Sequence, residues 1–335
     1  MRLNIYLIGA LLFLTVHGVN GQDLHYSQFF NSQMNINPAL TGIFNGDVRF
    51  TGHYRNQWPS VPVDYTTVSA AADMKFLRPN TNNFFSGGIL LNYDQAGDSQ
   101  LRFAQIGLGG SYSMEVASNN FITLGAMLGI ADRRFSLTNL TFDAQYTGGQ
   151  FDPSLPINEF FDRTGVTIFD VSLGGNYRWQ KTSRTKLDLG IGAFHINKPK
   201  HPFYDQDDIR LPIRFGIHAL AQFQVGDHFD LLARGLYQNQ SPYQETVLGL
   251  GGLFYINQKR GKEFGLELGV HYRLNDAIVP MVLLHWRALT VGYSHDINTS
   301  PFKVATNNNG GPELTLSYII TKVKPLSKYK VCPLF

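Results

Sequence analysis

The stretch from Phe264 to Leu274, FGLELGVHYRL, alternates apolar and polar side chains from end to end. Its apolar face carries Phe264, Leu266, Leu268, Val270, Tyr272 and Leu274, and its polar face carries Gly265, Glu267, Gly269, His271 and Arg273. Such alternation predicts a β-strand with one apolar and one polar face. Strands of soluble proteins average about five to six residues. This stretch instead has the roughly 9–11 residues that cross a bilayer at a tilt, so it predicts a membrane-spanning strand.

Two further stretches, 213–225 and 169–179, show the same pattern. The arginines of such segments fall in the polar phase. Because an arginine facing lipid at mid-membrane costs about 2–4 kcal/mol, these side chains are expected to point into the lumen of a barrel. The residues predicted to line that lumen are Arg178, Arg214, His218, Arg234, Glu267, His271 and Arg273.

The same pattern, followed along the chain, predicts an all-β fold: a transmembrane antiparallel β-barrel of about fourteen strands over residues 47–321. The expected strands are 47–56, 63–77, 84–94, 100–116, 120–132, 166–179, 185–197, 212–225, 227–238, 243–257, 264–274, 277–286, 287–297 and 312–321. An even number would return both termini to the periplasmic side. The long connections 133–165, 198–211 and 298–311 would then face outward, and the short ones 117–119, 180–184, 226 and 258–263 would face the periplasm. A soluble β-sandwich, the alternative, gives no reason for this asymmetry.

Composition and the two ends of the chain agree with an exported membrane protein. Only 16% of the residues are charged, and there are 33 glycines and 25 phenylalanines. Residues 1–21 are predicted to be a signal peptide, with Arg2 at its start, the apolar stretch from Ile5 to Val16, and small residues before Gln22. Residues 322–335 are expected to form a periplasmic tail.

Several classes of function find no support in the sequence. The formal net charge of +3 is too small to indicate nucleic-acid binding. The single cysteine, Cys332, can form neither an internal disulfide nor a zinc site. Polar residues such as Ser172 and His218 lack the local signature of a hydrolase. No catalytic residue, metal or cofactor is predicted.

Residues 22–46 precede the first expected strand and combine aromatic residues with Asn and Gln. Pro38 disfavours a helical Asn37, and Gly42 tolerates dihedral angles that other residues do not. The segment is therefore predicted to be compact. It is either a simple periplasmic leader or a plug or docking segment folded into the lumen, which in a barrel of this size is wide enough to need filling.

Three blocks carry a resemblance to a known family: QDLHYSQF at 22–29, NPALTG at 37–42 and YRNQW at 54–58. Together they resemble the PorP/SprF family, outer-membrane proteins of the type IX secretion and gliding systems of Bacteroidota. The resemblance implies partners among the type IX components and a secreted surface protein, such as a gliding adhesin, held at the cell exterior. It marks as partner-binding or plug residues Tyr26, Ser27, Gln28, Phe29, Asn37, Pro38, Ala39, Thr41 and Gly42.

Two other functions remain open at this point. Channels for long-chain fatty acids also have about fourteen strands and an N-terminal hatch with an Asn-Pro-Ala element, which Asn37, Pro38 and Ala39 match. A channel for hydrophobic small molecules is therefore the main alternative. A general porin is the third possibility, and it predicts an open, ion-conducting lumen.

Overall fold

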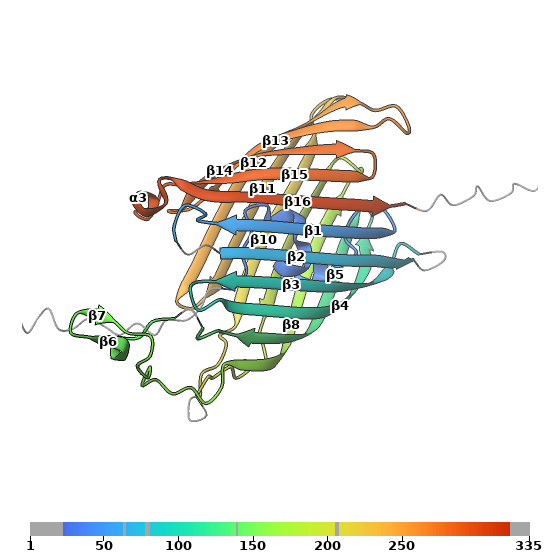
Figure 1. Ribbon diagram of the computed structural model, residues 1–335. Helices are drawn as coiled ribbons and strands as arrows, with labels where there is room; N and C mark the ends of the chain where they lie inside the picture. Colours follow the sequence, from blue (N-terminus) through green and yellow to red (C-terminus); the bar gives the residue numbers. More distant parts are fainter. Residues whose placement is uncertain (1–22, 63–64, 78–80, 139, 205–207, 322–335) are drawn as a thin grey trace, which may run out of the picture.

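The computed structural model describes residues 23–62, 65–77, 81–138, 140–204 and 208–321. Fourteen antiparallel strands close into one barrel, in which β1 pairs with both β2 and β16 (Figure 1). The barrel strands are β1 (Val48–Gln57), β2 (Tyr65–Leu77), β3 (Phe84–Ala96), β4 (Leu101–Ala117), β5 (Asn120–Arg134), β8 (Gly165–Gln180), β9 (Lys186–Phe194), β10 (Arg214–Gln224), β11 (Phe229–Gln240), β12 (Tyr243–Asn257), β13 (Phe264–Arg273), β14 (Ala277–Trp286), β15 (Leu289–Asn298) and β16 (Asn309–Ile320).

This architecture confirms the predicted fold class. Each expected strand has an observed counterpart, and β12 and β14 have the bounds predicted for them. The sequence analysis missed a small hairpin inside the long connection 133–165. There β6 (Tyr146–Thr147) pairs with β7 (Gln150–Phe151), next to the short helix η3 (Asp143–Gln145). The two-residue strands are too short to show a periodic pattern.

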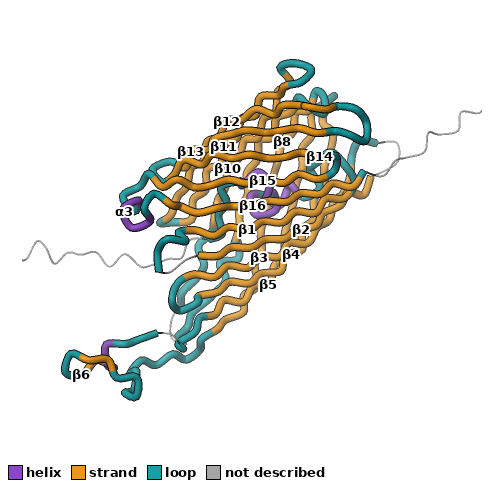
Figure 2. The backbone as a smooth tube through the Cα atoms, turned by 45° about the horizontal axis from the view of Figure 1, so that its top comes forward, coloured by secondary structure: helices purple, strands orange, loops and turns teal. Residues whose placement is uncertain are grey.

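The connections divide between the two ends of the barrel (Figures 1 and 2). At one end, called here the turn end, β1 begins, β16 ends, and the turns 181–185 and 258–263 lie. At the other, the loop end, lie 135–164 with its β6–β7 hairpin, 195–213, and 299–308 with α3 (Lys303–Thr306). The hairpin projects away from the barrel, beyond the loop end (Figure 2).

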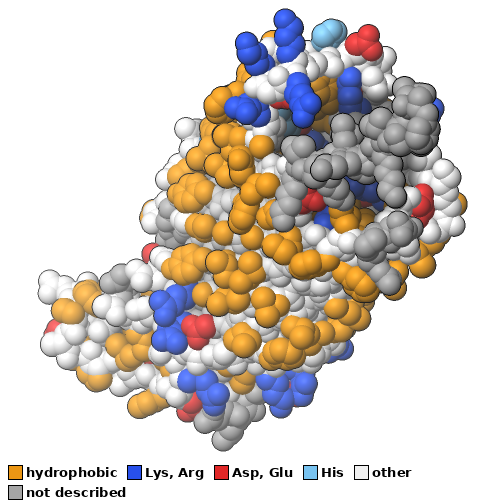
Figure 3. Space-filling model, turned by 90° about the vertical axis from the view of Figure 1, so that its right-hand side faces the viewer, with side chains coloured by type: hydrophobic (Ala, Val, Ile, Leu, Met, Phe, Trp, Pro, Cys, Tyr) orange, Lys and Arg blue, Asp and Glu red, His pale blue; other side chains and the backbone are white. Residues whose placement is uncertain are grey.

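The two faces of the barrel wall differ as the alternation predicts. Leu124 on β5 and Leu250 on β12 point outward and are each 67% exposed. Hydrophobic side chains cover much of the outer surface in Figure 3. In β13, Glu267, His271 and Arg273 are buried on the opposite face. Exposed apolar and buried polar side chains are the reverse of a soluble fold, because lipid replaces water as the outer solvent.

Residues 23–46, called here the plug, lie inside the barrel (Figure 2). They form three single turns: η1 (Phe29–Asn31), α2 (Gln33–Ile36) and η2 (Pro38–Leu40). In η1, Asn31 donates to Thr315 of β16, and η2 packs against β4, β5, β8 and β9. Pro38 at the start of η2 supplies a fixed φ and lacks the backbone donor that a first helical turn leaves unused.

The two ends of the described chain lie at opposite ends of the barrel. Val48 pairs with Ile320 at the turn end, as an even strand number requires. The plug, however, crosses the lumen, so Asp23 lies at the loop end, beside Gln240 and Arg214. The start of β1 and the end of β16 therefore share one end of the barrel, whereas the first described residue lies at the other. That both termini face the periplasm stays a prediction.

Two sequence predictions fall on residues outside the described ranges. These are the signal peptide, 1–21, and the tail, 322–335. Among the described residues, no helix has the length and apolar character needed to span a membrane.

Candidate functional site

At the block Tyr26–Phe29 of the plug, two backbone amides bind a buried carboxylate. Glu313 on β16 accepts hydrogen bonds from the backbone amides of Ser27 and Gln28, at 2.7 and 2.8 Å. The side chain of Gln28 donates to Ser294 Oγ at 3.1 Å and accepts from Thr315 Oγ1 at 2.8 Å. This block therefore has a single register against β15 and β16.

Arg273 on β13 is the centre of an ion-pair network beneath this block. Its guanidinium lies 2.8 Å from Asp296 and 3.1 Å from Glu245, and it donates to the Ser27 hydroxyl. Asp296 also pairs with Arg55 of β1 at 2.9 Å. His271, two residues before Arg273 on the same face, binds the carbonyl of Ser27 through Nδ1 at 2.9 Å.

The aromatic residues of the plug fill an apolar patch on the inner wall. Phe29 and Phe30 pack with residues of β11, β12 and β14, all facing inward. The wall residues of this cluster are Leu236, Val247, Ala277, Val279, Met281 and Leu283. Tyr26 is also buried, and its hydroxyl lies 2.5 Å from Ser69 Oγ on β2. Burial of a phenylalanine contributes about 1.5–3 kcal/mol.

The block Asn37–Gly42 lies against glycines of the inner barrel wall, among them Gly125 of β5 and Gly174 of β8. Asn37 caps η2 by accepting from the amide of Ala39 at 2.8 Å, and it donates to the carbonyl of Gly175 at 2.9 Å. A Cβ on Gly125 would lie 2.5 Å from the Cα of Ala39, closer than atoms tolerate. These wall glycines are therefore needed for the close approach of the Pro38–Ala39 backbone.

Thr41 and Gly42 join the plug to β1. The Thr41 hydroxyl donates to the carbonyl of Pro38 at 2.8 Å. Gly42 has a φ of +77°, which favours glycine, and its amide donates to Asp73 of β2 at 2.7 Å. Asp73 is held in turn by Arg49 at 2.6 Å.

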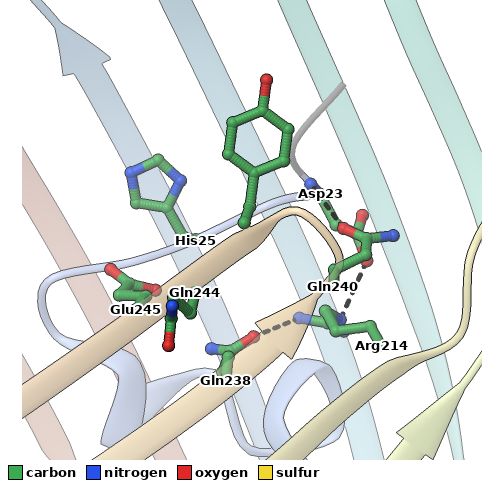
Figure 4. Close-up of a pocket in the computed structure, with 8 residues that line it drawn as sticks. Asp23, His25, Arg214, Gln238, Gln240, Gln244 and Glu245 are labelled. Atoms are coloured by element: carbon green, nitrogen blue, oxygen red, sulfur yellow. Dashed lines mark hydrogen bonds and ion pairs between the residues drawn. The ribbon is translucent and has the colours of Figure 1, made fainter. Parts of the chain in front are cut away.

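Asp23 fastens the plug at the loop end (Figure 4). Its carboxylate lies 3.0 Å from Arg214 Nε and 3.0 Å from His195 Nε2, and its amide donates to Gln240. Burial by itself would raise the pKa of Asp23, but Arg214 and His195 outweigh it and hold that pKa below its usual value. The carboxylate is therefore charged at neutral pH, and the cavity beside it, about 20 Å³, has room for about one water molecule.

The other predicted lumen residues also face inward. Arg234 lies over the ring of Phe30, 3.4 Å from its centre, and pairs with Glu267 at 2.7 Å. Arg178 pairs with Asp188 at 2.7 Å, and His218 lies 3.2 Å from Asn176. Every one of these residues lies on the lumen side of its strand, but they form several separate clusters. Within the described ranges, no group of His, Cys, Asp and Glu has the arrangement of a metal site.

The sequence analysis missed the apolar inner wall and the partners Asp23, Asp296 and Glu313. The signal for the apolar wall is present in β14, AIVPMVLLHW, whose inner face is apolar from Ala277 to Leu283 and polar only at His285. A barrel strand with so apolar an inner face must pack against something in the lumen. Nothing local in the sequence points to the three carboxylates, because their partners lie far away along the chain.

Several solved structures share the barrel fold. A Pseudomonas aeruginosa FadL homologue is similar with a TM-score of 0.53 and 12% identity, covering 86% of this chain and 93% of that one. A TodX monoaromatic hydrocarbon channel carrying the deltaS2S3 mutation has a TM-score of 0.50 and 8% identity, covering 86% and 94%. At such identities the likeness shows the fold alone.

Sequence comparison gives a more specific result. No curated protein has a sequence that matches this chain significantly. The family described as type IX secretion system membrane protein PorP/SprF matches residues 18–318, which include the plug and nearly all of the barrel. The chain is an outer-membrane β-barrel that belongs to the PorP/SprF family of type IX secretion system membrane proteins.

Proposed function

We propose that the protein is a plugged, non-enzymatic scaffold of the type IX system, which holds a specific secreted protein, such as a gliding adhesin, at the cell surface. The observation that carries this proposal is that the plug blocks the lumen. Charged and aromatic anchors fix the plug from Asp23 at the loop end to Gly42 near the turn end. A barrel blocked in this way acts through its loops and turns. The ligands of other proteins with this fold are not evidence for what this chain binds, because the likeness shows the fold alone.

We further propose that the turn end faces the periplasm and the loop end the cell exterior. The short turns and the barrel termini lie together, as in outer-membrane barrels generally. Basic residues on the periplasmic turns, such as Lys181, Lys259 and Lys262, would meet acidic type IX components or lipid phosphates. The plug and the barrel need no cofactor for this role.

Cysteine labelling of whole cells tests this orientation. In a Cys332→Ser background, Ser154→Cys beyond the β6–β7 hairpin is expected to react with a membrane-impermeant maleimide on intact cells. Lys259→Cys on the β12–β13 turn is expected to react only after the outer membrane is permeabilised. Both side chains are exposed, so labelling depends only on whether the maleimide can reach that side of the membrane. Labelling of Lys259→Cys on intact cells, with protection of Ser154→Cys, would reverse the proposed orientation.

Affinity purification tests the scaffold function. The full-length protein, tagged at its C-terminus and extracted from its native host in detergent, is expected to retain a secreted surface protein together with type IX components. Replacement of 141–160 by a Gly-Ser linker removes the β6–β7 hairpin and should release the surface protein alone. The matched variant, with 259–262 replaced in the same way, should keep it. If the intact protein retains neither class of partner, the proposal is wrong.

The main alternative, a channel for hydrophobic small molecules, requires a path through the lumen. The plug contacts β2, β4, β8, β10, β13 and β16 around the circumference of the barrel. These contacts close the lumen, so a channel would require the plug to move.

A further inference from the structure

The lumen is hollow at the turn end, between the plug and the barrel wall. Two cavities of about 310 and 290 Å³ lie there, and both are lined by Ile43, Phe44 and Arg178. Each is near the lower limit of about 300 Å³ for small-molecule sites. Figure 3 looks onto this end of the barrel. We call the two cavities together the vestibule.

The wall of the vestibule has an apolar part among polar and charged side chains. The larger cavity is lined by Leu220, Leu232 and Leu283 of the barrel, together with the plug side chains Leu40 and Ile43. The smaller cavity has Phe84 and Phe121 on its wall. These residues face the lumen, where an unfilled apolar surface gains free energy when a ligand's hydrocarbon covers it.

The charged residues of the vestibule are not balanced. Its arginines are already neutralised: Arg178 by Asp188 at 2.7 Å, and Arg234 by Glu267 at 2.7 Å. Arg49 is paired with Asp73 at 2.6 Å. Every carboxylate that lines the two cavities is therefore engaged by an arginine.

Two lysines remain, one in each cavity. Lys186 lines the larger cavity and Lys75 the smaller one. Lys75 donates to the carbonyl of Phe44 and lies 4.8 Å from the centre of that ring. Lys75 lies near Asp47 and Asp73, and Lys186 lies near Asp188 and Asp230. Asp73, Asp188 and Asp230 are each already paired with an arginine. The vestibule therefore keeps an excess of positive charge, which favours the binding of an anion.

We propose that the vestibule binds a small amphiphile that has one anionic head and a short apolar chain. The head would accept hydrogen bonds from Lys186 or Lys75, and the chain would cover the leucines and phenylalanines of the inner wall. The plug closes the far side, so the ligand enters and leaves at the turn end. This binding site is independent of the proposed scaffold function.

Binding of octanoate to the full-length protein in amphipol, measured by saturation-transfer NMR with empty amphipol as the blank, tests the proposal. Octanoate is expected to bind about tenfold more tightly than octan-1-ol, since the alcohol has the same chain but no negative charge to pair with a lysine ammonium. Acetate, which has the charge without the chain, should bind more weakly than both. Octyl phosphate in the same series distinguishes a phosphate head from a carboxylate head.

Variants locate the site. Lys186→Gln, and Lys186→Gln with Lys75→Gln, are expected to reduce octanoate affinity to that of octan-1-ol and to leave octan-1-ol binding unchanged. Lys259→Gln, on the exposed β12–β13 turn, is the matched control and should bind as the unaltered protein does. Equal affinities for octanoate and octan-1-ol in the unaltered protein would overturn the proposal. So would full octanoate binding by the double variant, or binding of a tetraglutamate peptide that octanoate does not displace.

Discussion

Replacement of Arg273 by methionine is expected to lower the free energy of unfolding by about 3–5 kcal/mol. Arg273 is buried and pairs with both Asp296 and Glu245. Methionine fills a similar volume but leaves Glu245 as a buried carboxylate without a cation. The loss should appear as a lower denaturant midpoint of the barrel reconstituted in lipid vesicles, followed by tryptophan fluorescence.

Two further variants assign the cause of this loss. Arg260→Met removes an arginine from the exposed β12–β13 turn and should change stability by less than about 1 kcal/mol. Adding Glu245→Gln to Arg273→Met removes the uncompensated charge and should recover part of the stability. If Arg273→Met and Arg260→Met unfold at the same denaturant concentration, the buried network does not stabilise the protein.

Displacement of the plug is expected to convert a closed barrel into an ion-conducting one. In Gly125→Val, even the Cβ of the new side chain would lie 2.5 Å from the Cα of Ala39. The helix η2 therefore cannot keep its position against β5. In planar bilayers the unaltered protein should be silent, and the variant should give discrete conductance steps. Deletion of 24–44 should give the same steps, because a barrel of this size has an aqueous lumen once it is emptied.

Gly175→Val is the matched control. Gly175 lies in β8 beside the same plug segment, but the nearest atom to its Cβ is Leu124 Cδ2 at 3.8 Å, an ordinary contact. This variant should remain silent. Steady conductance by the unaltered protein would support a porin instead, and a silent deletion variant would show that the plug does not seal the lumen.

The sequence alone determined the barrel. The fourteen strands, their outward and inward faces and the inward arginines of β8, β10, β11 and β13 all follow from period-two alternation. Alternation predicts the two faces because the outer face of a membrane strand meets lipid and the inner face meets the polar lumen. Each residue's environment is then set by its own position in the strand, independent of partners elsewhere. The family blocks at 22–29 and 37–42 also marked the segment that became the plug.

Only the tertiary structure decided how the plug is threaded and what holds it. Glu313 binds the amide of Ser27, 286 residues earlier in the chain, and Asp296 is shared by Arg55 and Arg273. Such partners depend on strand register and barrel closure, which no local pattern encodes. The same holds for Asp23, whose contact with Arg214 places the start of the described chain at the loop end. Local alternation specifies which face of a strand is polar, but closure of the barrel specifies which polar residues meet.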